Sequence, residues 1–273
     1  MIDNEMQFNS FVYDKNTSNI VTSISDNKSY PVICDKASTD SMTFENFKTY
    51  PEYKDILEHV SIEQGQLYYN LLKNTDIINS FDKFKINDTL GNPITFDYGV
   101  GDVSPTTLRY MKVLNDLMDN WDLNGMNIIE IGCGYGGQYT ILKQLIDVKS
   151  YSVVDLPEVI KLTERYLKTL KIDSGVVFMD GTSSGTEYGN YDLIISNYAI
   201  SECTEKVQKE YLEKIISKCS HGYITYNDIH QHFNLNVVYT LDDFIKDVKV
   251  FHPTVRVIDE TPTTFSNNKV LIW

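Results

Sequence analysis

The sequence is short of positive charge. Its 24 lysine and arginine residues stand against 38 aspartate and glutamate residues, so the formal net charge is −14. A protein that binds nucleic acid needs a basic surface to neutralise phosphates. The deficit therefore argues against nucleic acid as a partner, and it also disfavours binding to anionic membrane surfaces.

Long apolar runs and cysteine pairs are missing too. Because no run of about 18 apolar residues occurs, we expect no transmembrane helix and no insertion into a membrane. The first residues, M-I-D-N-E-M, lack the basic and apolar regions of a signal peptide. The cysteines form no C-x-x-C pair and show no zinc spacing, which predicts reduced thiols in a cytoplasmic protein: Cys34, Cys133, Cys203 and Cys219.

The most informative stretch is the segment 127–138, which reads N-I-I-E-I-G-C-G-Y-G-G-Q. Its apolar residues predict a strand, its glycines a turn, and the following residues 139–146 an amphipathic helix. This order places the N-terminus of a helix against an anionic or polar ligand. Glycine is needed because such a ligand approaches the backbone closely and some turn residues take positive φ.

Two classes of ligand fit this glycine turn. Gly132, Gly134 and Gly137 satisfy G-x-G-x-x-G, the fingerprint of dinucleotide-binding turns. A second pattern, E-x-G-x-G-x-G, holds S-adenosylmethionine (SAM) in class I methyltransferases and is matched by Glu130, Gly132, Gly134 and Gly136. Glu130 favours SAM, because a carboxylate at the strand end can reach the ammonium of an amino-acid ligand and would repel a pyrophosphate.

Acidic residues end the next two predicted strands. Asp155 follows the strand 151–154 and stands 23 positions after Gly132, close to the roughly 20-residue separation at which a carboxylate binds ribose hydroxyls. Asp180, which Gly181 follows, ends the strand 176–178 and is placed to accept a hydrogen bond from an adenine amino group. NAD and SAM would both use such acids, so they indicate a nucleoside of either kind.

The order of elements predicts the fold class. Strands at 127–131, 151–154, 176–178, 191–196 and 222–226 alternate with helical patterns, as in an α/β, doubly wound, mostly parallel Rossmann-like sheet. The strands 255–258 and 270–273 are joined by a short segment without a helical pattern. We therefore expect them to form a C-terminal antiparallel hairpin, which gives seven strands and is typical of class I methyltransferases.

The first hundred residues predict an arm and a mostly helical cap. With 273 residues, 42% of them hydrophobic, the chain is long enough for one large α/β domain with such a cap. Residues 11–13 and 30–33 are candidate short strands, whereas apolar residues recur at helical spacing from Tyr50 onward. A cap over the mouth of the sheet and plain packing against its edge fit equally well. We place the cap in residues 1–100 and the methyltransferase domain in 101–273.

A further helix is expected to begin at Ser104 and Pro105, which are a good N-cap and a good first helical residue. Its apolar face is Leu108, Met111, Leu114 and Met118. Most helical arginines are solvated, but Arg109 lies just before the first strand of the sheet, and we expect it to face the cofactor.

Five blocks of the sequence together resemble the family of sugar O-methyltransferases, which are class I SAM-dependent methyltransferases. The blocks are S-P-T-T-L-R-Y at 104–110, I-E-I-G-C-G-Y-G-G at 129–137, V-D-L-P-E-V at 154–159, I-S-N-Y-A-I-S-E at 195–202 and G-Y-I-T-Y at 222–226. Cys133 and Ile200 depart from the family's pattern. Order, spacing and identity agree over about residues 88–228, so the resemblance is more specific than a glycine motif.

This resemblance implies transfer of a methyl group from SAM to a sugar hydroxyl of a glycan or a nucleotide sugar. It assigns contacts with the cofactor to Glu130, Gly132, Gly134, Gly136, Asp155, Leu156, Asp180 and Asn197, beside which we also expect Arg109 and Gly181. The acceptor sugar, its hydroxyl and the oligomeric state are not implied.

A sugar hydroxyl is a poor nucleophile, so we expect a general base that adds about 10²- to 10⁴-fold to the rate. Ligands bind at the carboxyl ends of the strands in open α/β sheets. There we rank Glu202 and His230 first and Asp228 next as the base, and we expect contacts with the sugar from Tyr198, Tyr226 and His232. The D-x-H-x-H pattern of 228–232 resembles a metal site, but Mg²⁺ prefers carboxylates and water over histidine. We therefore expect no metal.

Two other functions fit parts of the sequence. The same glycine turn occurs in NAD-dependent oxidoreductases, against which Glu130 and the C-terminal hairpin argue. A SAM-binding, non-catalytic partner subunit stays open, because the identity of the base is not fixed by the sequence.

Overall fold

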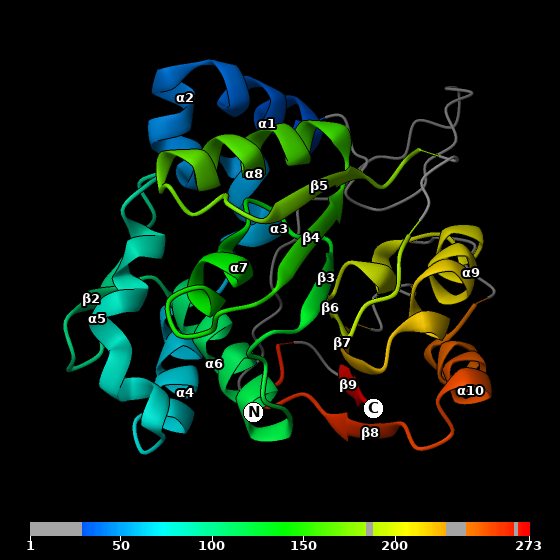
Figure 1. Cartoon of the computed structure of the whole chain (residues 1–273). Coiled ribbons are helices and arrows are strands. Elements are labelled where there is room, and N and C mark those ends of the chain that lie inside the picture. Colours follow the sequence, from blue (N-terminus) through cyan, green and yellow to red (C-terminus); the bar gives the residue numbers. More distant parts are fainter. Residues whose placement is uncertain (1–28, 184–187, 228–238, 265–266) are drawn as a thin grey trace.

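The computed structural model describes residues 29–183, 188–227, 239–264 and 267–273 (Figure 1). The candidate strand at 11–13 and the candidate site residues Asp228, His230 and His232 lie outside these ranges. Among the described residues, no helix combines the length and the apolar character needed to cross a membrane.

Seven strands of the described chain form one mixed sheet in the order β5-β4-β3-β6-β7-β9-β8. The strands are β3 (Asn127–Ile131), β4 (Ser150–Asp155), β5 (Val176–Asp180), β6 (Leu193–Asn197), β7 (His221–Tyr226), β8 (Arg256–Asp259) and β9 (Lys269–Ile272). Strands β3 to β7 are parallel, and β9 is antiparallel to both β7 and β8. The predicted fold class and its C-terminal hairpin are confirmed.

Helices cover both faces of this sheet (Figure 1). One face carries α6 (Pro105–Asn120), α7 (Gly137–Leu142) and α8 (Pro157–Thr169), and the other carries α9 (Glu205–Lys214) and α10 (Leu241–Phe251). The side chains of β3 divide between two cores: Ile128 packs with α6–α8, and Ile129 and Ile131 pack with α9 and α10. Because side chains alternate along a strand, Glu130 points to the α6–α8 face.

The start of α6 follows the sequence prediction. The Ser104 hydroxyl accepts a hydrogen bond from the Thr107 backbone at 3.1 Å, and Pro105 occupies the first turn. The predicted apolar positions Leu108, Met111 and Leu114 are fully buried. Met118 is 41% exposed, and the last turn of the buried face is formed by Leu117 in its place.

Upstream of α6 the described chain is mostly helical, as predicted. It contains α1 (Ser29–Thr39), α2 (Ser41–Asn46), α3 (Pro51–Leu57), α4 (Ile62–Leu72) and α5 (Phe81–Phe84), the 3₁₀ turns η2 (Phe47–Thr49), η3 (Asp76–Ser80) and η4 (Lys85–Asp88), and the short hairpin β1 (Phe96–Asp97) with β2 (Asp102–Val103). The strand predicted at 30–33 is wrong. Residues Tyr30, Ile33, Cys34 and Ala37 are buried at helical spacing, because α1 packs along α8.

The N-terminal helices contact the glycine turn through Lys48. This lysine is 2% exposed, and its ammonium donates to the backbone oxygen of Asn87 at 2.6 Å and lies 4.1 Å from the centre of the Tyr135 ring. Burial lowers the pKa of Lys48. Tyr135 belongs to the glycine turn, and its hydroxyl accepts from the Asn87 side chain at 2.9 Å. The helices thus brace the turn from one side, and the domain boundary near residue 100 stays a prediction.

Candidate functional site

The candidate site lies where the strand order reverses, between β3 and β6. Gly132, Gly134 and Gly136 follow β3 and all take positive φ (77°, 54° and 88°), which glycine adopts at no steric cost. A Cβ atom on Gly132 would lie 2.0 Å from the Ala199 Cβ, and one on Gly134 would lie 2.6 Å from the Leu57 Cδ1. The turn is therefore held between the segment after β6 and the end of α3.

Asp155 closes β4 beside this turn. Its Oδ2 accepts from the Gly134 backbone at 3.0 Å and its Oδ1 accepts from the Leu156 backbone at 2.8 Å. Burial raises the pKa of Asp155 to about 6, and the two backbone N–H groups oppose that rise. Because a carboxylate offers about four acceptor positions, Asp155 can hold the turn and still accept from ligand hydroxyls.

Asp180 lies next to Asp155, because the two residues are paired in register at the ends of β4 and β5. The Asp180 Oδ1 accepts from the Thr182 backbone at 2.8 Å and from its hydroxyl at 2.6 Å. The Gly181 backbone donates to the Asp155 backbone oxygen at 2.9 Å. The structure thus brings both predicted nucleoside-binding acids to one edge of the sheet.

Glu130 is buried within the sheet, whereas the sequence predicted that it would be in reach of a ligand at the strand end. It is 2% exposed, and the Tyr151 hydroxyl donates to its Oε2 at 2.9 Å. Burial raises the pKa of Glu130 from 4.5 to about 8. Its contact with a ligand ammonium stays a prediction, because its described partner is a tyrosine on the neighbouring strand.

The raised pKa of Glu130 predicts a pH-dependent stability. Between pH 5 and pH 8 the folded chain holds a proton on Glu130 that the unfolded chain has lost, so stability falls as pH rises through this window. The expected fall is up to about 1.4 kcal/mol per pH unit. Chemical unfolding of Glu130→Gln, which stays neutral and can still accept from Tyr151, should show a smaller slope than the parent. Equal slopes would contradict the prediction.

Asn197 at the end of β6 has a side-chain amide with no hydrogen-bond partner among the described residues. Both polar atoms of its side chain are buried and have no hydrogen-bond partner in the described part of the chain. Buried polar groups are normally hydrogen-bonded, so this amide is placed to bind a ligand. The glycine cradle, the two strand-end carboxylates and this amide together fit SAM.

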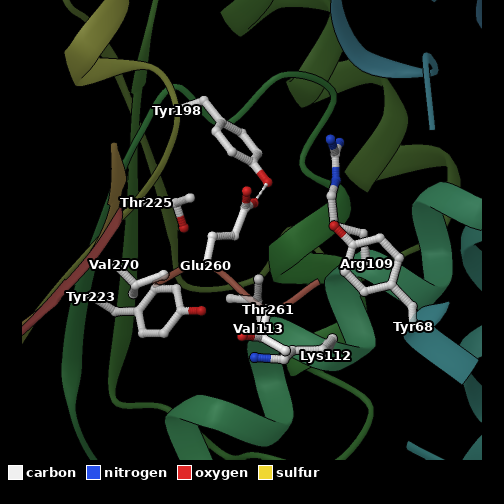
Figure 2. A pocket seen from close by; sticks show the side chains of 10 residues that line it. All are labelled: Tyr68, Arg109, Lys112, Val113, Tyr198, Tyr223, Thr225, Glu260, Thr261 and Val270. Atoms are coloured by element: carbon white, nitrogen blue, oxygen red, sulfur yellow. Dashed lines mark hydrogen bonds between the residues drawn. The ribbon is translucent and has the colours of Figure 1, made fainter. Parts of the chain in front are cut away.

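Beyond Asn197 the chain turns sharply at Tyr198, whose φ is 69°. Such a left-handed conformation costs a non-glycine residue about 1–3 kcal/mol and is concentrated at functional sites. The Tyr198 hydroxyl donates to the carboxylate of Glu260 (Figure 2). Glu260 is 8% exposed and also accepts from the Thr264 backbone at 2.8 Å and from the Asn268 amide at 2.9 Å.

A small cavity of about 20 Å³ lies beside Tyr198 and Glu260. In Figure 2, Tyr68 and Arg109 lie across it from Tyr223 and Val270, and the remaining lining residues are Lys112, Val113, Thr225 and Thr261. This volume holds about one water molecule, so a larger acceptor requires its walls to move.

Arg109 joins this cavity to the glycine turn. It is 5% exposed, its guanidinium donates to the Leu57 backbone oxygen at 3.2 Å, and its central carbon lies 5.7 Å from the centre of the Tyr198 ring. The arginine is therefore buried at the site rather than solvated on its helix. Its predicted contact with the cofactor is not tested by these contacts.

The prediction for Tyr226 is wrong. Its ring is fully buried 5.1 Å from the Phe244 ring, and its hydroxyl donates to the Gln208 side chain at 3.3 Å. These contacts place it in the core beneath α9 and α10. Because side chains alternate along β7, it is Tyr223 and Thr225 that line the cavity.

Glu202 lies in the 3₁₀ turn η5 (Ile200–Glu202), which begins three residues after the end of β6. Its Oε1 accepts from the Asn227 amide at 3.4 Å, so the carboxylate reaches toward the end of β7. This placement is compatible with the predicted role as a base, which stays a prediction.

Two residues that line the cavity, Tyr68 and Glu260, were not predicted from the sequence. Tyr68 and Glu260 belong to segments without a motif and reach the cavity only through the packing of α4 and the β8–β9 connection. No local sequence signal could have identified them.

The comparisons with known proteins agree with this geometry. Residues 82–228, more than half of the chain, match the family model described as protein-L-isoaspartate(D-aspartate) O-methyltransferase. Protein-L-isoaspartate O-methyltransferases of Pyrococcus abyssi and Pyrococcus horikoshii are both 24% identical over 115 residues, which are 42% of this chain and 51% and 50% of those proteins. The match thus spans about half the length of these relatives.

Solved structures are similar at lower identity. PigF with SAH has a TM-score of 0.47 at 9% identity, covering 82% of this chain and 73% of that one. An O-methyltransferase family protein from Burkholderia thailandensis has a TM-score of 0.44 at 12% identity, covering 61% and 59%. These values are too low to indicate an activity.

Proposed function

Because this chain belongs to the protein-L-isoaspartate(D-aspartate) O-methyltransferase family, we propose that it is a SAM-dependent O-methyltransferase. The supporting observation is the edge of the sheet at β3, β4 and β6. There, three glycines of positive φ, the Asp155 carboxylate and the Asn197 amide, which has no partner among the described residues, lie at the carboxyl ends of neighbouring strands. SAM is the methyl donor, and it supplies an activated methyl group on a sulfonium.

A sugar hydroxyl is the acceptor in this proposal. Tyr68 and Glu260, which line the cavity, lie outside the matched residues 82–228. The shared fold therefore does not by itself imply that this chain methylates the acceptor of the isoaspartyl enzymes. The five sequence blocks that resemble sugar O-methyltransferases support a sugar acceptor. The cavity supports it too, because tyrosine rings line it and the Tyr198 hydroxyl and Glu260 carboxylate form a hydrogen-bonding pair there.

The residues of this chain act mainly by holding the two reactants in line. Orientation of this kind supplies ~7–11 kcal/mol in favourable cases. Asp155 and Asp180 bind the nucleoside, while the Tyr198 hydroxyl and the Glu260 carboxylate bind the sugar. The base, Glu202 or His230, takes the proton of the attacking hydroxyl.

A second candidate acceptor is an isoaspartyl carboxylate, as the names of the relatives suggest. The observation in its favour is Arg109, a buried guanidinium at the cavity, because arginine binds carboxylates well. A carboxylate is ionised at neutral pH and needs no general base.

The product distinguishes the two acceptors. The protein is incubated with methyl-labelled SAM and either a panel of sugars and nucleotide sugars or an isoaspartyl peptide. An ether on a sugar survives mild alkali, whereas a methyl ester releases volatile labelled methanol. We expect alkali-stable label on a sugar; methanol release from the peptide alone would establish the second acceptor.

Calorimetry with S-adenosylhomocysteine and with NAD tests the cofactor. We expect binding of the first and not of the second. NAD binding without S-adenosylhomocysteine binding would refute the proposal. Binding of S-adenosylhomocysteine without methyl transfer to any cellular glycan, measured by mass spectrometry with and without the gene, would support a non-catalytic partner subunit.

A further inference from the structure

Glu58 stands at the rim of the glycine turn. It directly follows α3, whose last residue, Leu57, is packed against Gly134 and accepts a hydrogen bond from Arg109 at 3.2 Å. The carboxylate of Glu58 interacts with Lys48 from the N-terminal helices and with Thr106 in the first turn of α6.

One oxygen of this carboxylate has nothing to bind within the described chain. The Oε1 of Glu58 is buried and has no hydrogen-bond partner there. An unsatisfied buried acceptor is costly, and more so when it is charged. Burial raises the pKa of Glu58, and the positive charge of Lys48, a side-chain hydrogen bond with Thr106 and the positive charge of Arg109 oppose that rise.

The neighbouring cations do not satisfy this oxygen. The Lys48 ammonium donates to the Asn87 backbone oxygen, and Arg109 donates to the Leu57 backbone oxygen. The other two acids near the turn already have partners: Glu130 is bonded to Tyr151, and each oxygen of Asp155 accepts from a backbone N–H group. A cationic donor that enters beside Gly134 would therefore find its free carboxylate oxygen at Glu58.

We propose that Glu58 binds the ammonium group at the methionyl end of SAM, next to Arg109, which faces the carboxylate of the same end. This inference rests on the proposed function, since it assigns a contact to that cofactor. It also gives α3, which lies outside the matched residues 82–228, a direct part in cofactor binding.

The test compares two ligands by calorimetry on the full chain. S-Adenosylhomocysteine keeps the ammonium and the carboxylate, and 5′-methylthioadenosine has neither. Glu58→Gln should weaken binding of the first by about tenfold or more, as expected for loss of a charge-assisted hydrogen bond. Binding of the second should change by less than twofold. Glu52→Gln, which removes the same charge from an exposed position on α3, should change neither.

Equal weakening of both ligands, or of neither, would overturn the inference and leave the proposed function standing. If the parent protein binds no S-adenosylhomocysteine, the proposed function itself fails. Should Glu58→Gln not fold, as judged by circular dichroism, Glu58→Asp replaces it. The shortened side chain keeps the charge and should still lower affinity for S-adenosylhomocysteine selectively; parent-like affinity there would also refute the inference.

Discussion

Replacing Asp155 with alanine is expected to abolish most of the affinity for S-adenosylhomocysteine. The carboxylate should accept two charge-assisted bonds from the ribose, each of about 1.5–3 kcal/mol. Together they correspond to a rise of about 10²- to 10⁴-fold in Kd. The structure adds a second reason, because the same carboxylate fixes the Gly134 and Leu156 backbones and so shapes the turn.

Calorimetry and thermal unfolding, measured on the same sample, separate these effects. Asp155→Asn keeps one carbonyl acceptor and should lose less affinity than Asp155→Ala. Asp147→Ala, at a position whose side chain is 93% exposed, is the matched control and should bind like the parent. An unchanged Kd for folded Asp155→Ala would mean that the ribose binds elsewhere.

Loss of the general base is expected to lower kcat by about 10²-fold or more while cofactor affinity holds. If His230 is the base, its unperturbed pKa of about 6.5 suits the role, and His230→Gln should show this loss. If Glu202 is the base, burial must raise its basicity, and Glu202→Gln should show the loss while His230→Gln stays mild. Steady-state kinetics of product formation measures kcat for each variant, and calorimetry in parallel measures its cofactor affinity.

The opposite result is equally informative. If both substitutions leave kcat within a few-fold of the parent, neither residue is the base. Asp228 and His232 would then be tested next, with positioning alone as the remaining explanation. For a carboxylate acceptor, which needs no base, this mild outcome is the expected one, so the kinetics also bear on the choice of acceptor.

The sheet could be predicted because its central strands are buried on both faces and therefore read as continuous apolar runs. Gly132, Asp155 and Asp180 marked where β3, β4 and β5 end. The absence of a helical pattern before β9 predicted the hairpin. The run at 30–33 failed for a physical reason: a short apolar stretch fits a strand or a buried helix equally well. Only the packing of α1 on α8 decides between them.

The cofactor side of the site can be predicted from the sequence, because Gly132, Asp155 and Asp180 each stand at a strand end and parallel strands end at one edge of the sheet. The acceptor side cannot be predicted in this way. Choosing between Tyr226 and Thr225 requires the register of β7 against its neighbouring strands, because a shift of one residue moves every side chain of a strand to the opposite face of the sheet. Glu58 and Glu260 reach the site through contacts distant in sequence, for which composition and periodicity hold no information.

The place of β9 between β7 and β8 has a consequence for synthesis on the ribosome. In the described chain β8 pairs with the sheet through β9 alone, although it is made first. Until residues 269–272 emerge, β7 is an open edge and β8 has no strand to join. Open edges of this kind pair with other chains. The nascent protein must therefore carry the parallel strands β3–β7 with the edge of β7 unpaired, and it is during this interval that a chaperone would protect it most.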